Sequence, residues 1–194
     1  MLSAATRILR LAFESTTTAA TLPEDHPLID FVAYTRDGLL TGSLRLDADR
    51  LTDLLNASDE VHLVEVRCLG FDGRLVETDH AVVMRADLIA VKASHPRGNS
   101  AFRYRTRQVP VAAGAGAFVM HGYIHGRPGA DPMIHLGRRA PMVPLTDATI
   151  GYETAEGWQR DEASTLIINR DAADWLRPAN EAEVGRLGRR SGAA

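Results

Sequence analysis

Short apolar runs separated by turn residues recur along this chain, and several of them alternate apolar with polar side chains. In residues 29–46 the apolar side chains fall at every second position on both sides of the turn Asp37-Gly38. This period of two is typical of half-buried strands, and Asp-Gly is typical of a tight hairpin turn. The pattern predicts a β-hairpin, and Gly42 within its second strand predicts a bend or a bulge.

The next segments continue the β-rich pattern with one short helical interruption. Residues 47–56 carry leucines at helical spacing after Asp49, which predicts one or two helical turns with Asp49 as the N-cap. Residues 61–69 predict a strand, 71–73 a turn, and 75–91 one or two further strands.

The same order of landmarks occurs twice along the chain. A glycine, an acidic residue in an apolar run, a turn glycine and an arginine recur, with separations that rise from 80 to 85 residues. The matched pairs are Gly42 and Gly122, Glu65 and Asp147, Gly73 and Gly157, and Arg85 and Arg170. Because small loop insertions would produce such drift, the sequence predicts a tandem duplication of a unit of roughly 70 residues.

The duplication divides the chain into five segments. An N-terminal amphipathic helix and linker are expected at 1–21, a first unit at 28–93, a linker at 94–108, a second unit at 109–178 and a polar tail at 179–194. A unit of this size is too small for a two-sheet sandwich, whereas a bent sheet that closes on itself covers a core with little chain. The expected fold is therefore mainly β, with two tandem small bent-sheet barrels and a short N-terminal α-helix.

The first unit resembles the Sm-like and SH3-like small barrels. Residues 31–34, the turn Asp37-Gly38 and residues 40–42 resemble the first two strands of the Sm-like family, and residues 86–91 resemble its closing strand. The resemblance covers about residues 30–92. This sequence departs from the family by an insertion at 47–58, and by lacking the Asn and the Lys-Gly or Arg-Gly of the RNA-contacting loops. The resemblance therefore implies the fold and leaves RNA binding in doubt.

The whole chain is also similar to a bacterial domain family of unknown function, through residues 51–56 and the strands that follow them. That similarity implies a duplicated domain and no particular activity.

Composition narrows the classes of function. A net charge of −3 gives no overall attraction to nucleic acid or anionic membrane, and the single cysteine, Cys68, allows neither an intramolecular disulfide nor a cysteine-rich metal site. A run of 18 or more apolar residues, as a transmembrane helix requires, is absent from the sequence. The first residues do not resemble a secretion signal. A cytoplasmic protein without a cofactor is expected.

One basic cluster with an aromatic residue stands out at 103–107. Arg103, Arg105 and Arg107 could contact phosphates while Tyr104 stacks on a base, and the alternative is a solvated linker. The spacing of Arg103 and Arg107 also occurs before barrels that bind cyclic dinucleotides, but the second part of that motif is missing downstream. Nucleic-acid or nucleotide binding is kept as an alternative function.

His121 and His125 are the candidate metal ligands, four residues apart in an apolar context that predicts a strand. Residues four apart in a strand lie about 13 Å from each other, so one ion cannot bind both. The matched carboxylates Glu65 and Asp147 could act as an acid–base pair, but a hydrogen bond to a loop backbone is the expected role.

Motifs of nucleophilic catalysis, zinc proteases and phosphate loops are missing from the sequence. A non-enzymatic binding or scaffolding protein that self-associates is therefore expected, with an enzyme whose site lies between the units as the remaining alternative. Leu9 and Phe13 of the N-terminal helix are expected to bury against a barrel or a neighbouring subunit. A homo-oligomer is expected, either a dimer or a trimer with six barrels, and a different protein partner is possible.

Overall fold

The structure is a computed structural model, and it describes residues 26–93, 106–131, 133, 134, 136–138 and 140–186. The predicted helix at 1–21, with Leu9 and Phe13, lies outside the described residues, as do residues 94–105 of the predicted linker.

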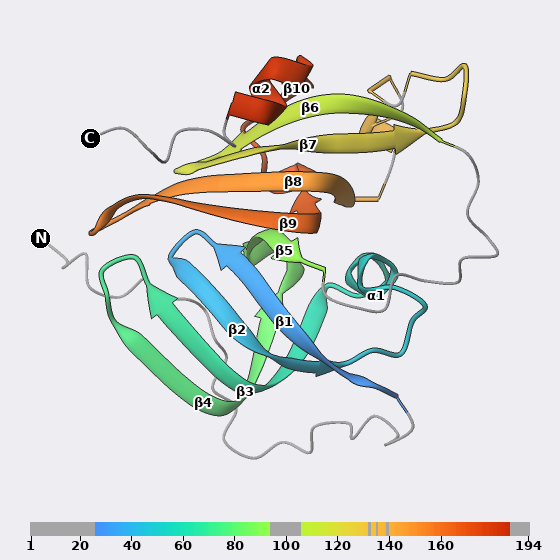
Figure 1. Cartoon of the computed structure of the whole chain (residues 1–194). Helices are drawn as coiled ribbons and strands as arrows, with labels where there is room; N and C mark the ends of the chain where they lie inside the picture. Colours follow the sequence, from blue (N-terminus) through green and yellow to red (C-terminus); the bar gives the residue numbers. More distant parts are fainter. Residues whose placement is uncertain (1–25, 94–105, 132, 135, 139, 187–194) are drawn as a thin grey trace, which may run out of the picture.

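The described residues form one antiparallel sheet of ten strands with short helical segments, so the prediction of a mainly β protein is confirmed (Figure 1). The strands of the first half are β1 (Leu28–Thr35), β2 (Gly38–Arg45), β3 (Glu60–Gly70), β4 (Leu75–Met84) and β5 (Leu88–Lys92). Those of the second half are β6 (Arg107–Ala115), β7 (Phe118–Gly126), β8 (Met142–Thr154), β9 (Gly157–Asn169) and β10 (Trp175–Pro178). The helical segments are α1 (Leu51–Ala57), η1 (Arg85–Asp87), η3 (Leu136–Arg138), η4 (Arg170–Ala172) and α2 (Glu181–Arg186).

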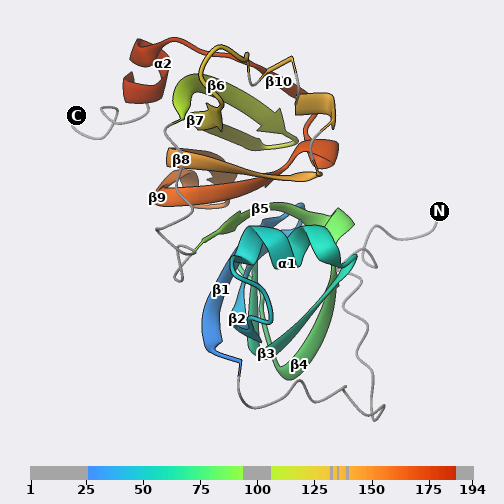
Figure 2. The same ribbon diagram turned by 90° about the vertical axis from the view of Figure 1, so that its right-hand side faces the viewer.

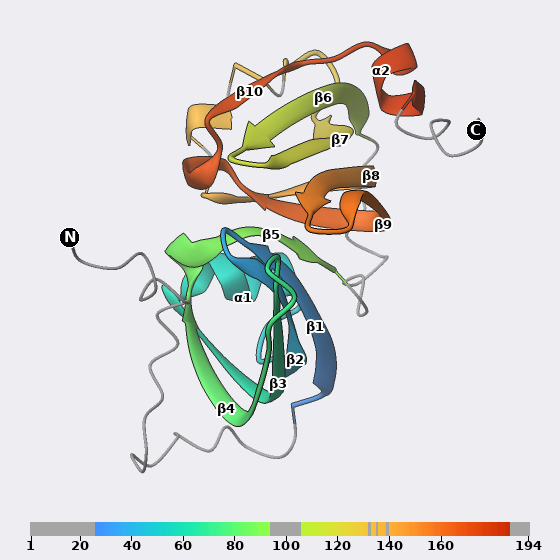
Figure 3. The same ribbon diagram turned by 90° about the vertical axis from the view of Figure 1, so that its left-hand side faces the viewer.

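The two halves have the same strand order. The sheet runs β10-β6-β7-β8-β9-β5-β1-β2-β3-β4, so the fifth strand of each half lies beside its first strand and the fourth strand lies at the far side. The pairing of β5 with β9 joins the halves, and this pair of strands is called the junction below. The sheet is not closed: it ends at β10 and at β4, on opposite sides of the molecule (Figure 3).

The strand registers of the halves also correspond. Phe31 lies opposite Gly42 in the first half and Val111 lies opposite Gly122 in the second, so both members of the pair are displaced by 80 residues. The described part of β6 begins at Arg107, two residues before the predicted start of the second unit.

The glycine and the acidic residue of the repeat belong to one structural feature, a β-bulge. The register of β2 on β3 shifts at Gly42 and that of β7 on β8 shifts at Gly122. Two residues of the partner strand oppose each glycine, Glu65 and Val66 on β3 and Asp147 and Ala148 on β8. Glu65 and Asp147 are the two non-glycine residues with positive φ among those described, at 52° and 47°. A Cβ on Gly42 would lie 3.0 Å from the carbonyl oxygen of Val64, so the bulged strand approaches the glycine closely.

Glu65 and Asp147 were expected to hydrogen-bond a loop backbone, and the structure gives them a different role. Each occupies the left-handed region of the backbone at its bulge, and the described residues place no loop N–H on either carboxylate. The two acidic residues occupy the same position in the two bulges.

We expect Glu65→Gly and Asp147→Gly each to raise the free energy of unfolding by up to about 1 kcal/mol. The left-handed region costs an L-residue about 1–2 kcal/mol, and glycine avoids this cost while losing some backbone entropy on folding. Urea denaturation measures the change. The matched control is His62→Gly at an exposed strand position of β3, which should lose about 0.5–1 kcal/mol. Equal destabilisation by all three variants would contradict the expectation.

One hydrophobic core lies on each side of the junction, and each core includes residues from the other half of the chain. The core of the first half includes Met142 and Ile167, and the core of the second half includes Tyr34, Ile89 and Ala90. The halves are therefore packed as one body.

Helix α1 packs into the core of the first half through Leu51 and Leu55, and it also contacts β8 of the second half beneath the junction (Figure 2). Its N-cap is Arg50 without a side-chain hydrogen bond, so the prediction of Asp49 as the cap was wrong by one residue. The Asn56 side chain donates to the carbonyl of Met142 at 2.9 Å and accepts from its N–H at 3.0 Å. This amide contact satisfies both backbone groups of Met142, where β8 begins.

Candidate functional site

The junction is a strand pair buried on both faces. Val91 and Ile167 face the core of the first half, while Ala90 and Ile168 face the core of the second, and all four are fully buried. The paired residues are Ala90 and Ile168, Val91 and Ile167, and Lys92 and Leu166. One more ladder bond runs from the Ala93 N–H to the Thr165 carbonyl at 3.0 Å. Two such segments can therefore share one sheet and cover each other's cores.

Tyr34 crosses the junction and fixes its geometry. Its ring is fully buried and meets the ring of Phe118 at 6.0 Å and that of Tyr152 at 5.5 Å, both near edge-to-face. Its hydroxyl donates to Oδ2 of Asp161 at 2.7 Å, and Nζ of Lys92 lies 3.3 Å from Oδ1 of the same carboxylate. Aromatic pairs of this geometry stabilise by about 0.5–1.5 kcal/mol beyond the area that they bury.

Burial and the charges around Tyr34 keep its hydroxyl protonated. Burial, followed by the hydrogen bond and the negative charge of Asp161, raises the pKa of Tyr34 far above its usual range, and burial also raises the pKa of Tyr152. Tyr34 therefore stays protonated and acts as a hydrogen-bond donor.

The strands that correspond to the junction strands lie at the free ends of the sheet. Strand β4 corresponds to β9, and β10 corresponds to β5, because they hold the same places in their halves. Both ends carry exposed apolar side chains, namely Met84, which is 37% exposed, and Trp175, which is 43% exposed. The Trp175 ring packs on β6 over Gly114, where a Cβ would come within 2.3 Å of the ring.

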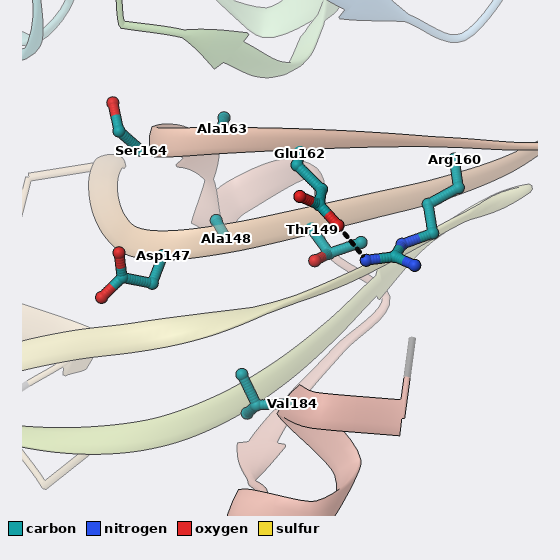
Figure 4. A pocket seen from close by; sticks show the side chains of 8 residues that line it. All are labelled: Asp147, Ala148, Thr149, Arg160, Glu162, Ala163, Ser164 and Val184. Carbon is teal, nitrogen blue, oxygen red and sulfur yellow. Dashed lines mark hydrogen bonds and ion pairs between the residues drawn. The ribbon is translucent and has the colours of Figure 1, made fainter. Parts of the chain in front are cut away.

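An open hollow of about 420 Å³ lies in the second half, between β8, β9 and α2 (Figure 4). Its lining residues are Asp147, Ala148, Thr149, Arg160, Glu162, Ala163, Ser164 and Val184. Arg160 forms an ion pair with Glu162, and Figure 4 shows Asp147 at the opposite end from Arg160. Because the arginine charge is matched by its own strand neighbour and Asp147 adds a negative charge, the hollow offers an anionic ligand no unmatched positive charge.

The two candidate metal ligands both lie on β7, as strand residues. The His125 ring contacts hydroxyls through both nitrogens, with Thr106 Oγ1 2.8 Å from Nδ1 and Thr146 Oγ1 2.8 Å from Nε2. His121 is buried, at 8% exposed, and its Nδ1 has no hydrogen-bond partner among the described residues. Over the described part of the chain, the structure brings no three His, Cys, Asp or Glu side chains together in a metal-binding group.

We expect His121 to make the protein less stable as the pH falls. Burial lowers the pKa of His121 from its usual value of 6.5, Arg177 lowers it further, and Glu183 opposes the shift. The neutral form is therefore favoured in the folded state, so the stability that it gives is present above about pH 6.5 and is lost as the pH falls toward the folded pKa.

Urea midpoints at pH 7.5 and pH 5.0 measure this dependence, and His121→Gln serves as the comparison. The variant should lose less stability than the unmodified chain between these two pH values. An identical loss in both proteins would show that the titration of His121 is not linked to folding.

The predicted phosphate-binding cluster is described only in part. Arg103, Tyr104 and Arg105 lie outside the described residues, and Arg107 is exposed at the start of β6, opposite Gly126. Phosphate binding by this cluster therefore stays a prediction. No helix among the described residues is long and apolar enough to cross a lipid bilayer.

The sequence carries a signal for the junction in two apolar runs. Residues 88–91 and 166–168 are uninterrupted apolar runs, and all of these residues are buried in the structure. A continuous apolar run is typical of a strand covered on both faces, whereas a strand with one wet face alternates. These two runs differ in this way from the alternating burial of β3. The run at 81–84 on β4 is also uninterrupted, so the pattern marks candidate strands and does not name the pair that joins the halves.

Comparisons with protein-family models, with curated proteins and with solved structures found no match to this chain.

Proposed function

We propose that the protein is a non-enzymatic, cytoplasmic scaffold, built from two duplicated small bent-sheet barrels, that assembles with copies of itself through the ends of its sheet. One observation carries the proposal. The chain already joins its two five-stranded halves edge to edge at the junction, and the strands corresponding to the junction strands are left at the ends of the sheet.

The physical reason is the cost of free strand edges. An end strand presents N–H and C=O groups that a further strand can pair, and proteins usually shield such groups with charge, proline or a covering segment. The ends here carry apolar side chains beside their charges, Met84 on β4 and Trp175 on β10. Covering them would release apolar surface from water, which favours association.

Light scattering of the full chain at micromolar concentrations tests the proposal, with a mass of several chains expected. The chain offers a matched pair of variants, because Trp158 and Trp175 are both about half exposed and each packs over a glycine. Trp175 lies on an end strand, whereas Trp158 lies on β9 near its turn with β8. Trp175→Asp should reduce the mass to one chain and Trp158→Asp should leave it unchanged. A one-chain mass of the unmodified protein at tens of micromolar would refute the scaffold function.

A further inference from the structure

We infer that the partner of the β10 end is the β4 end of a second copy of this chain, paired antiparallel in the register of the junction. This inference rests on the proposed self-association, and it specifies which two sheet ends meet and which residues pair. Two free ends can meet in three ways, namely β4 with β4, β10 with β10, or β10 with β4. The junction is a template for the last of these alone.

The correspondence between the halves fixes which residues would meet. In the first half Val32 lies opposite Lys92, and in the second half Ala112 lies opposite Arg177, so β10 is β5 displaced by 85 residues. Strand β9 is β4 displaced by the same amount, because the pairs Val64–His80 and Thr146–Thr165 occupy the same place beside the bulge. The junction pairs then become Trp175 with Val83, Leu176 with Val82, and Arg177 with Ala81.

The faces of the strands agree with this register. At the junction, Ala90 of β5 turns toward the core of the half that supplies β9. By the same geometry Trp175 would turn toward the core that contains Ala81 and Val83 in the next chain. Leu176 already packs against the core of its own half, and Val82, now only partly buried, would be covered from the other side. A slip of one residue would reverse all of these faces.

One large ring lies in each half at the matching strand pair. In the first half Tyr34 lies opposite Ala90, and in the second half Gly114 lies opposite Trp175, so the large and small residues exchange strands. At the junction, the Tyr34 ring packs into the core of the second half and contacts Phe118. Trp175 is the corresponding ring at the β10 end, and it is 43% exposed in the single chain.

Two features weaken this second pairing relative to the junction. Pro178 corresponds to Ala93 and lacks the N–H that Ala93 donates, so one ladder bond is missing. Arg177 corresponds to Lys92, and its charge is held by Glu183 at 3.2 Å rather than by a group across the joint. Association that is weaker than the internal junction, and therefore dependent on concentration, is the expected result.

A joint between two different ends is heterologous. Repetition of such a joint gives a ring where the rotation closes and a filament where it does not. The joint therefore predicts assemblies in which each chain uses both of its ends, either a closed ring or a filament.

Engineered cysteines on Ala81 and Arg177 test the pairing. Because the Ala93 N–H bonds the Thr165 carbonyl, Lys92 and Leu166 form a non-hydrogen-bonded pair, whose Cα atoms are about 4.5 Å apart in antiparallel sheets. The corresponding residues 81 and 177 would therefore lie within the reach of a disulfide, about 4.4–6.8 Å. The natural Cys68 is buried and remains in place as a background in every sample.

An equimolar mixture of the Ala81→Cys and Arg177→Cys proteins, treated with a mild oxidant, should give a two-chain product on a non-reducing gel. Each single variant alone should stay at the mass of one chain, and the double variant should give products of three or more chains. A mixture of Val82→Cys with Arg177→Cys should give at least tenfold less product, because those side chains would leave opposite faces of the sheet.

The outcomes separate this inference from the proposed function. A two-chain product from Ala81→Cys alone or from Arg177→Cys alone would show that like ends meet, and would overturn the inference while the scaffold function stands. An absence of product from the mixture, with light scattering still showing several chains, would overturn it in the same way. A one-chain mass of the unmodified protein would overturn both.

Discussion

Tyr34→Ala should lower the free energy of unfolding by about 3–5 kcal/mol, the usual cost of removing a buried aromatic ring. Tyr34 is fully buried between the halves, and its ring contacts Phe118 and Tyr152 of the second half. The truncation would leave a cavity between the two halves, and the contacts of β1 with the core of the second half would be lost. Thermal or urea denaturation followed by circular dichroism measures the loss.

Tyr34→Phe is the control for this change, because it keeps the ring and removes only the hydroxyl. Asp161 would keep Lys92 at 3.3 Å, and its side chain is 38% exposed, so water can replace the lost donor. A loss of about 1 kcal/mol is expected. Similar losses for both substitutions would mean that the hydrogen bond to Asp161, rather than ring packing, holds the halves together.

Gly38→Ala should cost about 3 kcal/mol, although it adds a single methyl group. A Cβ on Gly38 would lie 2.2 Å from the carbonyl oxygen of Leu69 and 2.8 Å from the Cα of Gly70. Both are backbone atoms of β3, so the hairpin can accept the methyl only if the strands separate and the ladder is disturbed. The change should appear as a lower urea midpoint.

Gly70→Ala provides the comparison, because Gly70 lies directly opposite Gly38 in the same strand pair. There the atom closer than 3 Å is Oδ1 of Asp72, at the end of a side chain that can rotate away. The expected loss of stability is about 1 kcal/mol, mainly because Asp72 would lose the hydrogen bond that its Oδ1 accepts from the N–H of Arg74. If Gly70→Ala were the more damaging substitution, the backbone clash at Gly38 would not be the controlling factor.

Local features of the fold were readable from the sequence because they depend on neighbouring residues. The hairpin around Asp37-Gly38 follows from alternation and from the turn, and it is confirmed by the pairing of β1 with β2. The recurring landmarks were also real features, since Gly73 and Gly157 both have positive φ and Arg85 and Arg170 both begin short 3₁₀ helices. The prediction that Glu65 and Asp147 accept hydrogen bonds from a loop backbone was wrong, since both lie in the bulges with positive φ.

The candidate site was mostly hidden from the sequence. Self-association was expected from the general vulnerability of strand edges, yet which strands stay free follows from the order β10-β6-β7-β8-β9-β5-β1-β2-β3-β4, and that order depends on pairings between distant residues. Alternation can assign a face to each strand, but it cannot name the neighbouring strand, because any apolar face satisfies it.

The sequence by itself determined that the chain is mainly β, where the turns at 37–38 and 72–73 lie, and that a bend or bulge occurs at Gly42. These properties follow from periodicity and from residues with special backbone freedom, which act over a few positions. Only the tertiary structure decided that β5 pairs with β9, that Tyr34 of one half completes the core of the other, and that Trp175 lies half exposed at an end of the sheet. Those outcomes depend on shape and burial between segments far apart in the chain, where the free energy of covering apolar surface selects one arrangement among many that the local pattern allows.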